Sequence, residues 1–146
     1  MNLPKACIVL AAAISISATA CGSSEPDMKA ALRDPNVVAK LREMAVEAAG
    51  ESTVTTMRAV AVSDHQAAET VLSGSIIYDH APVFVIVITG GPFTAGRHPP
   101  GVPAPEGDVL TITVDAASYD VTDVGIGDVD PDLSEVASAS VDLSAK

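Results

Sequence analysis

Three histidines, two with an acid beside them, are the side chains best suited to catalysis or metal binding. His65 follows Asp64, His80 follows Asp79, and His98 has no acidic neighbour. A metal centre needs three or four such ligands that converge, and the sequence contains no His-x-x-x-His or Cys-x-x-Cys spacing. Both Asp-His pairs also suit ordinary positions in a first helical turn or a loop. We therefore predict no catalytic residue, metal or cofactor. A metal-dependent or hydrolytic envelope enzyme that uses these three histidines is kept as the alternative to a non-catalytic protein.

The charge of the chain limits its partners. The 146 residues carry 8 Lys and Arg against 19 Asp and Glu, a formal net charge of −11. Binding to nucleic acid and electrostatic docking on anionic lipid both need clustered cations, so we expect neither. The alternating acids of residues 128–132 begin like a calcium-binding EF-hand loop. However, Leu133 and Ala139 occupy the positions that need Gly and Glu.

The first twenty residues predict export. A short n-region containing Lys5 precedes an apolar-biased stretch at residues 6–17, and small residues end this segment at Ala20. That layout is typical of a secretory signal peptide, and the apolar stretch is shorter than the ~20 residues that span a bilayer. We therefore predict a signal peptide over residues 1–20.

Cys21 follows these small residues directly and precedes glycine and serines, which resembles a bacterial lipoprotein signal. The resemblance implies that the Cys21 thiol is acylated, with palmitate as an expected lipid, and becomes the mature N-terminus. The departure is Ala18, where the pattern usually has Leu, and Ala18-x-Ala20 also suits ordinary signal peptidase. We expect the protein on the outer face of the cell membrane, held by the lipid on Cys21, or secreted if Cys21 is not acylated.

Periodicity and turn residues divide the remainder into a tether, one domain and a tail. Residues 21–33 are expected to form a lipid-anchored tether with a short helix. Asp34 and Pro35 predict a helix start, Gly50 predicts its end, and the apolar run at residues 83–88 predicts a central strand. The acidic residues 128–146 predict a disordered tail. The α+β domain over residues 34–127 is expected to contain helix 35–49, strand 54–62, helix 64–73, strand 83–89, a Pro/Gly loop 90–107, and strands 108–115 and 119–126.

This order predicts an α+β fold, a small and mainly antiparallel β-sheet with helices packed on one face. Three segments resemble PepSY-like domains: an alanine-rich helix at 67–74 that ends in glycine, the strand at 82–87, and the Val-Asp-Ala strand end within 112–116. The loop at 99–107 and the hairpin after it are similar to small secreted proteins of unknown function from actinobacteria. The resemblance implies a non-catalytic envelope module, linked in some relatives to inhibition of peptidases, and carries over no catalytic residue.

Two departures from the PepSY-like pattern concern the loops. Ser118-Tyr119 replaces the usual Thr-Gly of the turn, and tyrosine disfavours positive φ, so the turn must differ or tolerate strain. The loop at 90–107 is also longer than usual. Ten of its eighteen residues are Gly or Pro.

Long loops on a compact sheet often bind partners, although a rigid surface loop would have the same composition. We name Phe93, Arg97, His98 and Pro99 as the candidate partner-binding residues of this loop. The sequence therefore predicts a non-catalytic cell-envelope or secreted lipoprotein that acts as a protein- or peptide-binding module.

Overall fold

The computed structural model describes residues 27–96 and 98–144. The predicted signal peptide and Cys21 lie outside these residues. The helices and strands follow in the order α1 (Met28–Ala31), α2 (Pro35–Ala49), β1 (Thr53–Val62), α3 (His65–Leu72), β2 (Val83–Thr94), β3 (Glu106–Asp115), β4 (Val121–Gly127) and β5 (Ala137–Asp142).

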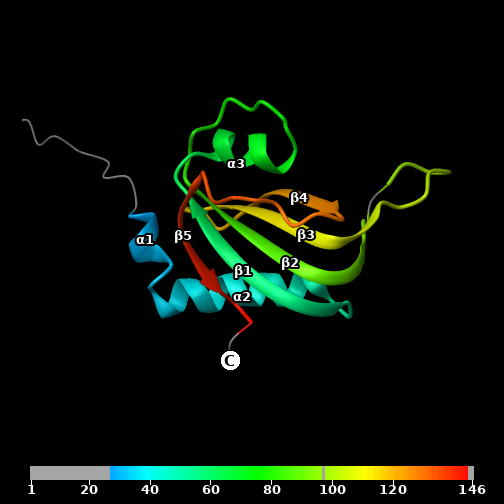
Figure 1. The fold of residues 1–146 in the computed structure, drawn as a ribbon, viewed down its shortest axis with the longest axis horizontal. Coiled ribbons are helices and arrows are strands. Elements are labelled where there is room, and N and C mark those ends of the chain that lie inside the picture. The colour runs from blue at the N-terminus through cyan, green and yellow to red at the C-terminus, as the bar shows by residue number, and fades with distance from the viewer. Residues whose placement is uncertain (1–26, 97, 145–146) are drawn as a thin grey trace, which may run out of the picture.

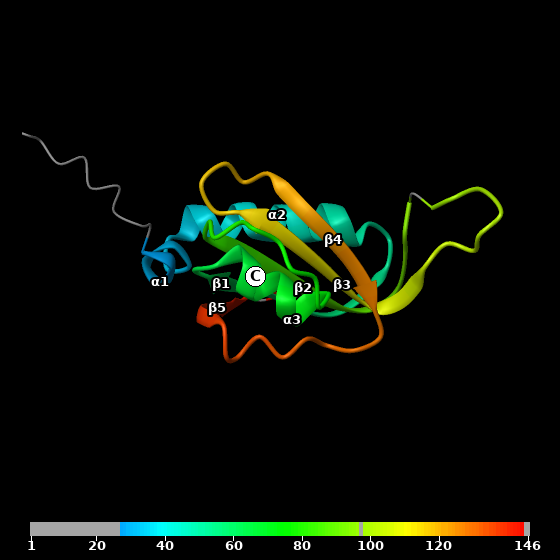
Figure 2. The ribbon, with the colours of Figure 1, turned by 90° about the horizontal axis from the view of Figure 1, so that it is seen from above.

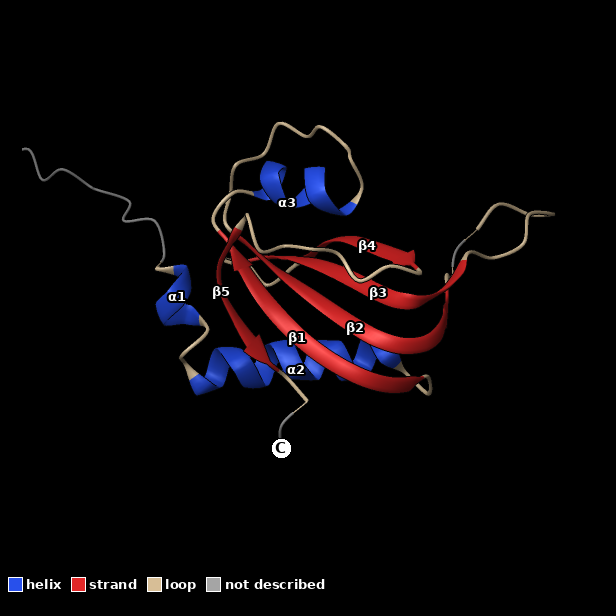
Figure 3. Cartoon of the chain, viewed as in Figure 1, coloured by secondary structure: helices blue, strands red, loops and turns tan. Residues whose placement is uncertain are grey.

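The five strands form one sheet with the order β4-β3-β2-β1-β5, and all neighbouring strands are antiparallel (Figure 1, Figure 3). Strand β2 lies in the middle, while β4 and β5 form the two edges. This arrangement confirms the predicted α+β class. Within the described residues, every strand predicted from the sequence is present, with its ends displaced by a few residues in some cases.

The apolar run of β2 is buried on both faces of the sheet, as predicted for a central strand. Its even-numbered side chains Phe84, Ile86 and Ile88 pack toward α2, and its odd-numbered side chains Val83, Val85 and Val87 pack toward α3. The helices therefore lie on both faces rather than one, with α2 below the sheet and α3 above it in Figure 1. The expectation of one-sided helices was wrong because a strand that is apolar on both faces needs a cover on each.

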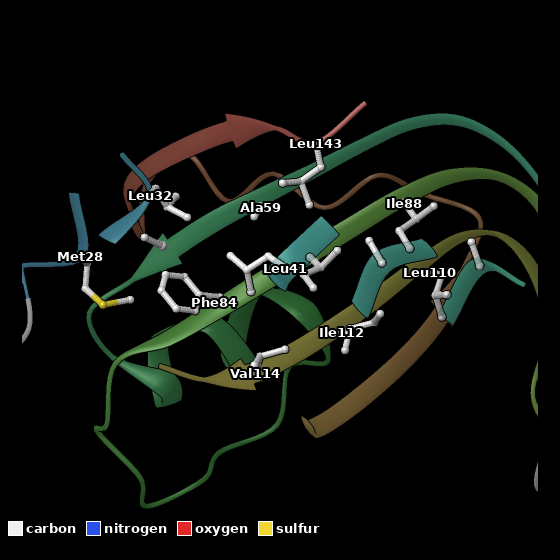
Figure 4. Close-up of a cluster of buried hydrophobic side chains, with 14 of the residues drawn as sticks. Met28, Leu32, Leu41, Ala59, Phe84, Ile88, Leu110, Ile112, Val114 and Leu143 are labelled. Atoms are coloured by element: carbon white, nitrogen blue, oxygen red, sulfur yellow. The ribbon is translucent and has the colours of Figure 1, made fainter. Parts of the chain in front are cut away.

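Helix α2 begins and ends at the residues that the sequence predicted. The Asp34 carboxylate accepts the backbone N–H of Asn36 at 2.8 Å, Pro35 follows it, and Gly50 ends the helix with φ of 57°. The buried face of the helix, Leu41, Ala45 and Ala49, packs on the larger core cluster. Figure 4 shows this cluster, in which side chains from α1, α2 and the strands meet: Met28, Leu32, Leu41, Phe84, Ile112, Val114 and Leu143.

The acidic segment after β4 is ordered and belongs to the fold. Because β4 and β5 lie at opposite edges, the segment that joins them crosses the α3 face of the sheet, as seen from above in Figure 2. Leu133 is buried in the cluster on that face, and the Asp130 carboxylate accepts two hydrogen bonds from Arg58 at 2.8 and 2.6 Å. The prediction of a disordered tail over 128–146 was therefore wrong for residues 128–144.

Strand β2 continues further than predicted, to Thr94, so the free loop is shorter than residues 90–107. The pairing with β3 is interrupted between Thr89 and Phe93 and then resumes. Gly90 makes this irregularity feasible because its φ is 139° and a Cβ atom there would lie 2.1 Å from the Thr53 carbonyl oxygen. The described residues of the remaining loop, 95–96 and 98–105, extend away from the sheet (Figure 1).

The turn between β3 and β4 tolerates the strain that the sequence indicated. Tyr119 has φ of 63°, and no other described non-glycine residue has a positive φ. The turn is held by the Asp115 carboxylate, which accepts the backbone N–H groups of Ala117 and Ser118 at 2.9 and 2.8 Å. The Tyr119 ring also stacks on Phe84 with the centroids 6.2 Å apart. Strand β4 therefore starts at Val121, two residues later than predicted.

Candidate functional site

An apolar groove lies between the C-terminal half of α2 and strand β4. Its main hollow has a volume of about 870 Å³, and a neighbouring hollow of about 390 Å³ shares Ala48 and Val124 with it. We call the two together the α2–β4 groove. Apolar side chains of α2, β3 and β4 line the groove: Met44, Ala48, Leu110, Val121, Val124 and Ile126. The end of β2 and the base of the projecting loop also line its main hollow, through Phe93, Ala95 and Pro105.

The groove exists because none of the described helices packs directly over β4. The buried residues of α2 pack against β1, β2 and β3, whereas Val121 and Val124 of β4 are 51% and 56% exposed. Both valines lie on the α2 face, since Val124 pairs with Ile112 and Val121 with Val114. Neighbouring exposed apolar side chains of this kind are typical of binding surfaces.

Of the predicted partner-binding residues, the three that the structure describes do not form one surface. Phe93 belongs to β2 and is only 3% exposed, so its ring packs in the core and forms part of the groove wall. His98 and Pro99 are exposed on the projecting loop, where the His98 imidazole lies 3.2 Å from the Pro99 carbonyl oxygen. Arg97 lies outside the described residues. The placement of Phe93 in the loop was wrong because the strand resumes after Gly90–Pro92, whereas its role in partner binding stays a prediction.

His65 is the most enclosed of the histidines. Its Nδ1 lies 2.9 Å from an Asp79 carboxylate oxygen, and its Nε2 lies 3.7 Å from Oε1 of Glu69. Glu69 is itself buried, and the Thr113 hydroxyl donates to it at 3.2 Å. This cluster links α3 to β3 and to the segment before β2. We therefore interpret it as structural, because it holds α3 against the sheet.

His80 and His98 do not join this cluster. The His80 Nδ1 lies 3.0 Å from the Asp64 carboxylate, a separate and exposed pair, and His98 belongs to the projecting loop. Among residues 27–96 and 98–144, no group of three or more His, Cys, Asp or Glu side chains is arranged to hold a metal ion. The structure therefore does not bring the three histidines of the enzyme hypothesis together.

Hydrogen bonds to the Asp79 and Asp64 carboxylates make the free energy of unfolding depend on pH. The backbone N–H of Ala81, and after it the His65 imidazole, donate to the Asp79 carboxylate and lower its pKa. The His80 imidazole similarly lowers the pKa of Asp64. A carboxyl with a lowered pKa binds its proton less readily in the folded chain than in the unfolded chain. Its stabilising contribution is therefore present above about pH 4 and is lost as the pH falls through the folded pKa.

We expect the Asp79→Asn variant to lose less stability on acidification than the wild type. The asparagine oxygen can still accept the Ala81 N–H, but the side chain no longer titrates. Urea unfolding of both proteins at neutral pH and at about pH 3 measures the difference. Equal losses in the two proteins would contradict the role of Asp79.

Sequence reasoning missed the α2–β4 groove. Val121, Val124 and Ile126 were expected in a strand, but their pattern does not tell which helix, if any, covers them. The available signal was that this valine-bearing segment contains Asp123 and is flanked by Asp120 and Asp128, so its composition is both apolar and acidic. Strand β4 carries its large apolar side chains on one face and lies at an edge of the sheet.

Comparisons with family models, with curated proteins and with solved structures gave no match. The PepSY-like resemblance therefore stays a prediction. Within the described residues, none of the helices is long and apolar enough to cross a membrane.

Proposed function

We propose that this protein is a non-catalytic binding module that holds a protein or peptide segment in the α2–β4 groove. The observation that carries the proposal is the open apolar groove beside β4, an edge strand whose outer side has no partner among the described residues. Val121 and Val124 line this groove and stay largely exposed to water. Covering such side chains with a partner gains the free energy of apolar burial, about 25 cal/mol per Å².

The unpaired edge gives the groove a second means of holding a peptide. An edge strand presents backbone N–H and C=O groups that an added strand can pair with. No described strand pairs with the outer edge of β4. The opposite edge, β5, is less open because its residues Ala137, Ala139 and Val141 are half-buried and α1 lies beside it. These features favour β4 as the binding edge.

The proposal predicts that Val124→Glu weakens peptide binding. The purified protein is used to select binders from a phage library of random peptides, and their affinity is measured by calorimetry. Val124→Glu should weaken binding by about tenfold or more, because a carboxylate would be buried without a partner under the ligand.

Val46→Glu provides the matched control. Val46 is 55% exposed, close to the 56% of Val124, but it does not line the groove. This variant should bind the selected peptides as the wild type does. Equal affinity of the Val124→Glu and Val46→Glu variants would place the binding site elsewhere and reject the groove.

We further propose that the module is exported and anchored to the outer face of the cell membrane by a lipid on Cys21. The sequence around Cys21 supports this proposal. Wild-type protein isolated from its own cells should then partition with membranes and have an intact mass that starts at Cys21 plus the acyl groups. The Cys21→Ala variant should lack the acyl mass and leave the membrane fraction. An unmodified wild-type chain in the medium would instead indicate secretion.

A further inference from the structure

We propose that the segment bound in the α2–β4 groove is an extended strand with alternating apolar and basic side chains, which pairs with β4. This inference rests on the proposed function and specifies the chemistry of the partner. Its apolar side chains would lie on the α2 face beside Val121 and Val124. Its basic side chains would lie on the α3 face beside Asp123.

The pleat of β4 separates the two kinds of contact. Val124 pairs with Ile112, whose side chain belongs to the core cluster between α2 and the sheet. Asp123 pairs with Thr113, whose side chain contacts Glu69 of α3 on the other face. Since directly paired residues point to the same face, Asp123 and Val124 lie on opposite faces of the sheet. The pairing of β4 with β3 is irregular between Val121 and Asp123, so the alternation of faces is regular from Asp123 to Gly127. A strand added along these residues would continue that alternation.

The acidic residues in the C-terminal third of the sequence favour a basic partner. Between Arg97 and Lys146 the sequence has ten acidic residues and no Lys or Arg. Asp120, Asp123 and Asp128 lie in or next to β4 and are exposed, and Glu47 lines the groove on the α2 side. Lys40 of α2 lies over the Tyr119 ring at the turn before β4. Along the strand itself, a Lys- or Arg-bearing segment meets Asp123 on the α3 side and Glu47 on the α2 side, which favours its association.

A second copy of the chain fits the same edge less well. Two copies paired through β4 would bring the Asp120, Asp123 and Asp128 carboxylates of both chains together. Each chain also has a formal net charge of −11. Like charges across an interface oppose association, so the charge favours a basic partner over self-pairing.

The test uses soluble peptides as probes on the full mature chain. One peptide alternates lysine and valine over the seven residues of β4, and a matched peptide alternates glutamate and valine. The lysine peptide should bind saturably, and its affinity should fall when salt rises from about 0.05 to about 0.5 M, because the Debye length shortens. Asp123→Asn should weaken it by about two- to fivefold, the range for an exposed ion pair. Asp142→Asn on β5, at the opposite edge, should not change it.

Backbone methylation tests the strand pairing itself. Two N-methylated isomers of the lysine peptide are compared. One carries methyl groups on the backbone nitrogens of its odd-numbered residues, and the other carries them on those of its even-numbered residues. Only one edge of an added strand pairs with β4, so one isomer should bind like the parent and the other should not. Equal binding of both isomers would overturn strand addition.

The remaining outcomes separate this inference from the proposed function. If lysine and glutamate peptides bind equally and Val124→Glu weakens both, the basic partner is rejected and the groove stands. Failure of the lysine peptide to bind also rejects the basic partner, and the phage selection then decides on the groove. A dimer in sedimentation that Val124→Glu dissociates and that excludes the peptide would assign the edge to a second copy instead.

Discussion

Replacing Phe84 with alanine should lower the free energy of unfolding by about 3–5 kcal/mol. Phe84 lies in the central strand β2 and is 1% exposed in the cluster between α2 and the sheet. Its ring also supports Tyr119, which holds the strained turn before β4 and lies 4.3 Å from the Lys40 ammonium group. The substitution leaves a cavity and removes this support at the same time.

Urea unfolding followed by circular dichroism measures the Phe84→Ala effect, with Tyr78→Ala as the control. Tyr78 is also aromatic but is 95% exposed, so its loss should change stability by no more than about 0.5 kcal/mol. Similar effects of the two substitutions would mean that β2 is not the covered centre of the sheet.

The Leu143→Ala substitution should lower the free energy of unfolding by about 2–5 kcal/mol. Leu143 is fully buried in the α2 cluster. Its backbone N–H donates to the Met57 carbonyl oxygen at 2.8 Å, and its own carbonyl oxygen accepts from the Arg42 Nε at 2.8 Å. The segment around Leu143 is therefore held by α2 and β1 together.

The control for Leu143→Ala is Val129→Ala, in the same C-terminal part of the chain. Val129 is 80% exposed, and its truncation should leave stability nearly unchanged. If Leu143→Ala is tolerated as well as Val129→Ala, the C-terminal segment contributes little to the fold, as a disordered tail would.

Local signals predicted the elements that depend on local interactions. Asp34, Pro35 and Gly50 cap α2 through their own backbone geometry, so the sequence located this helix at Pro35–Ala49. The run at residues 83–88 predicted a covered central strand because six adjacent apolar residues need apolar neighbours on both faces. Both predictions are confirmed.

The C-terminal segment could not be predicted from local signals because its contacts are distant in sequence. Asp130 pairs with Arg58, and Leu143 packs under α2, whereas the segment itself is acidic and interrupts its few large apolar residues with polar ones. Acidic composition is typical of disordered tails. Here the apolar Leu133 and Leu143 outweigh that tendency, because each fills a place in a core that other elements form.

The candidate site depends on tertiary placement even more strongly. The sequence predicted a strand close to Val121–Gly127 but not that α2 would leave it uncovered, which depends on where the helix crosses the sheet. For Phe93, the glycines and prolines suggested a loop, whereas Gly90 allowed the strand to resume. The binding hypothesis therefore keeps its class, a protein- or peptide-binding module, and moves from the loop tip to the α2–β4 groove.

The most direct test of the α2–β4 groove is an amide NMR titration of the labelled protein with a peptide selected from the random library. We expect the largest shifts at the backbone amides of Val121–Gly127, with smaller ones at the groove-lining part of α2 around Ala48. Slower hydrogen exchange at the β4 amides that face outward should accompany them. Shifts confined to the loop around His98 and Pro99, or to β5, would contradict the groove.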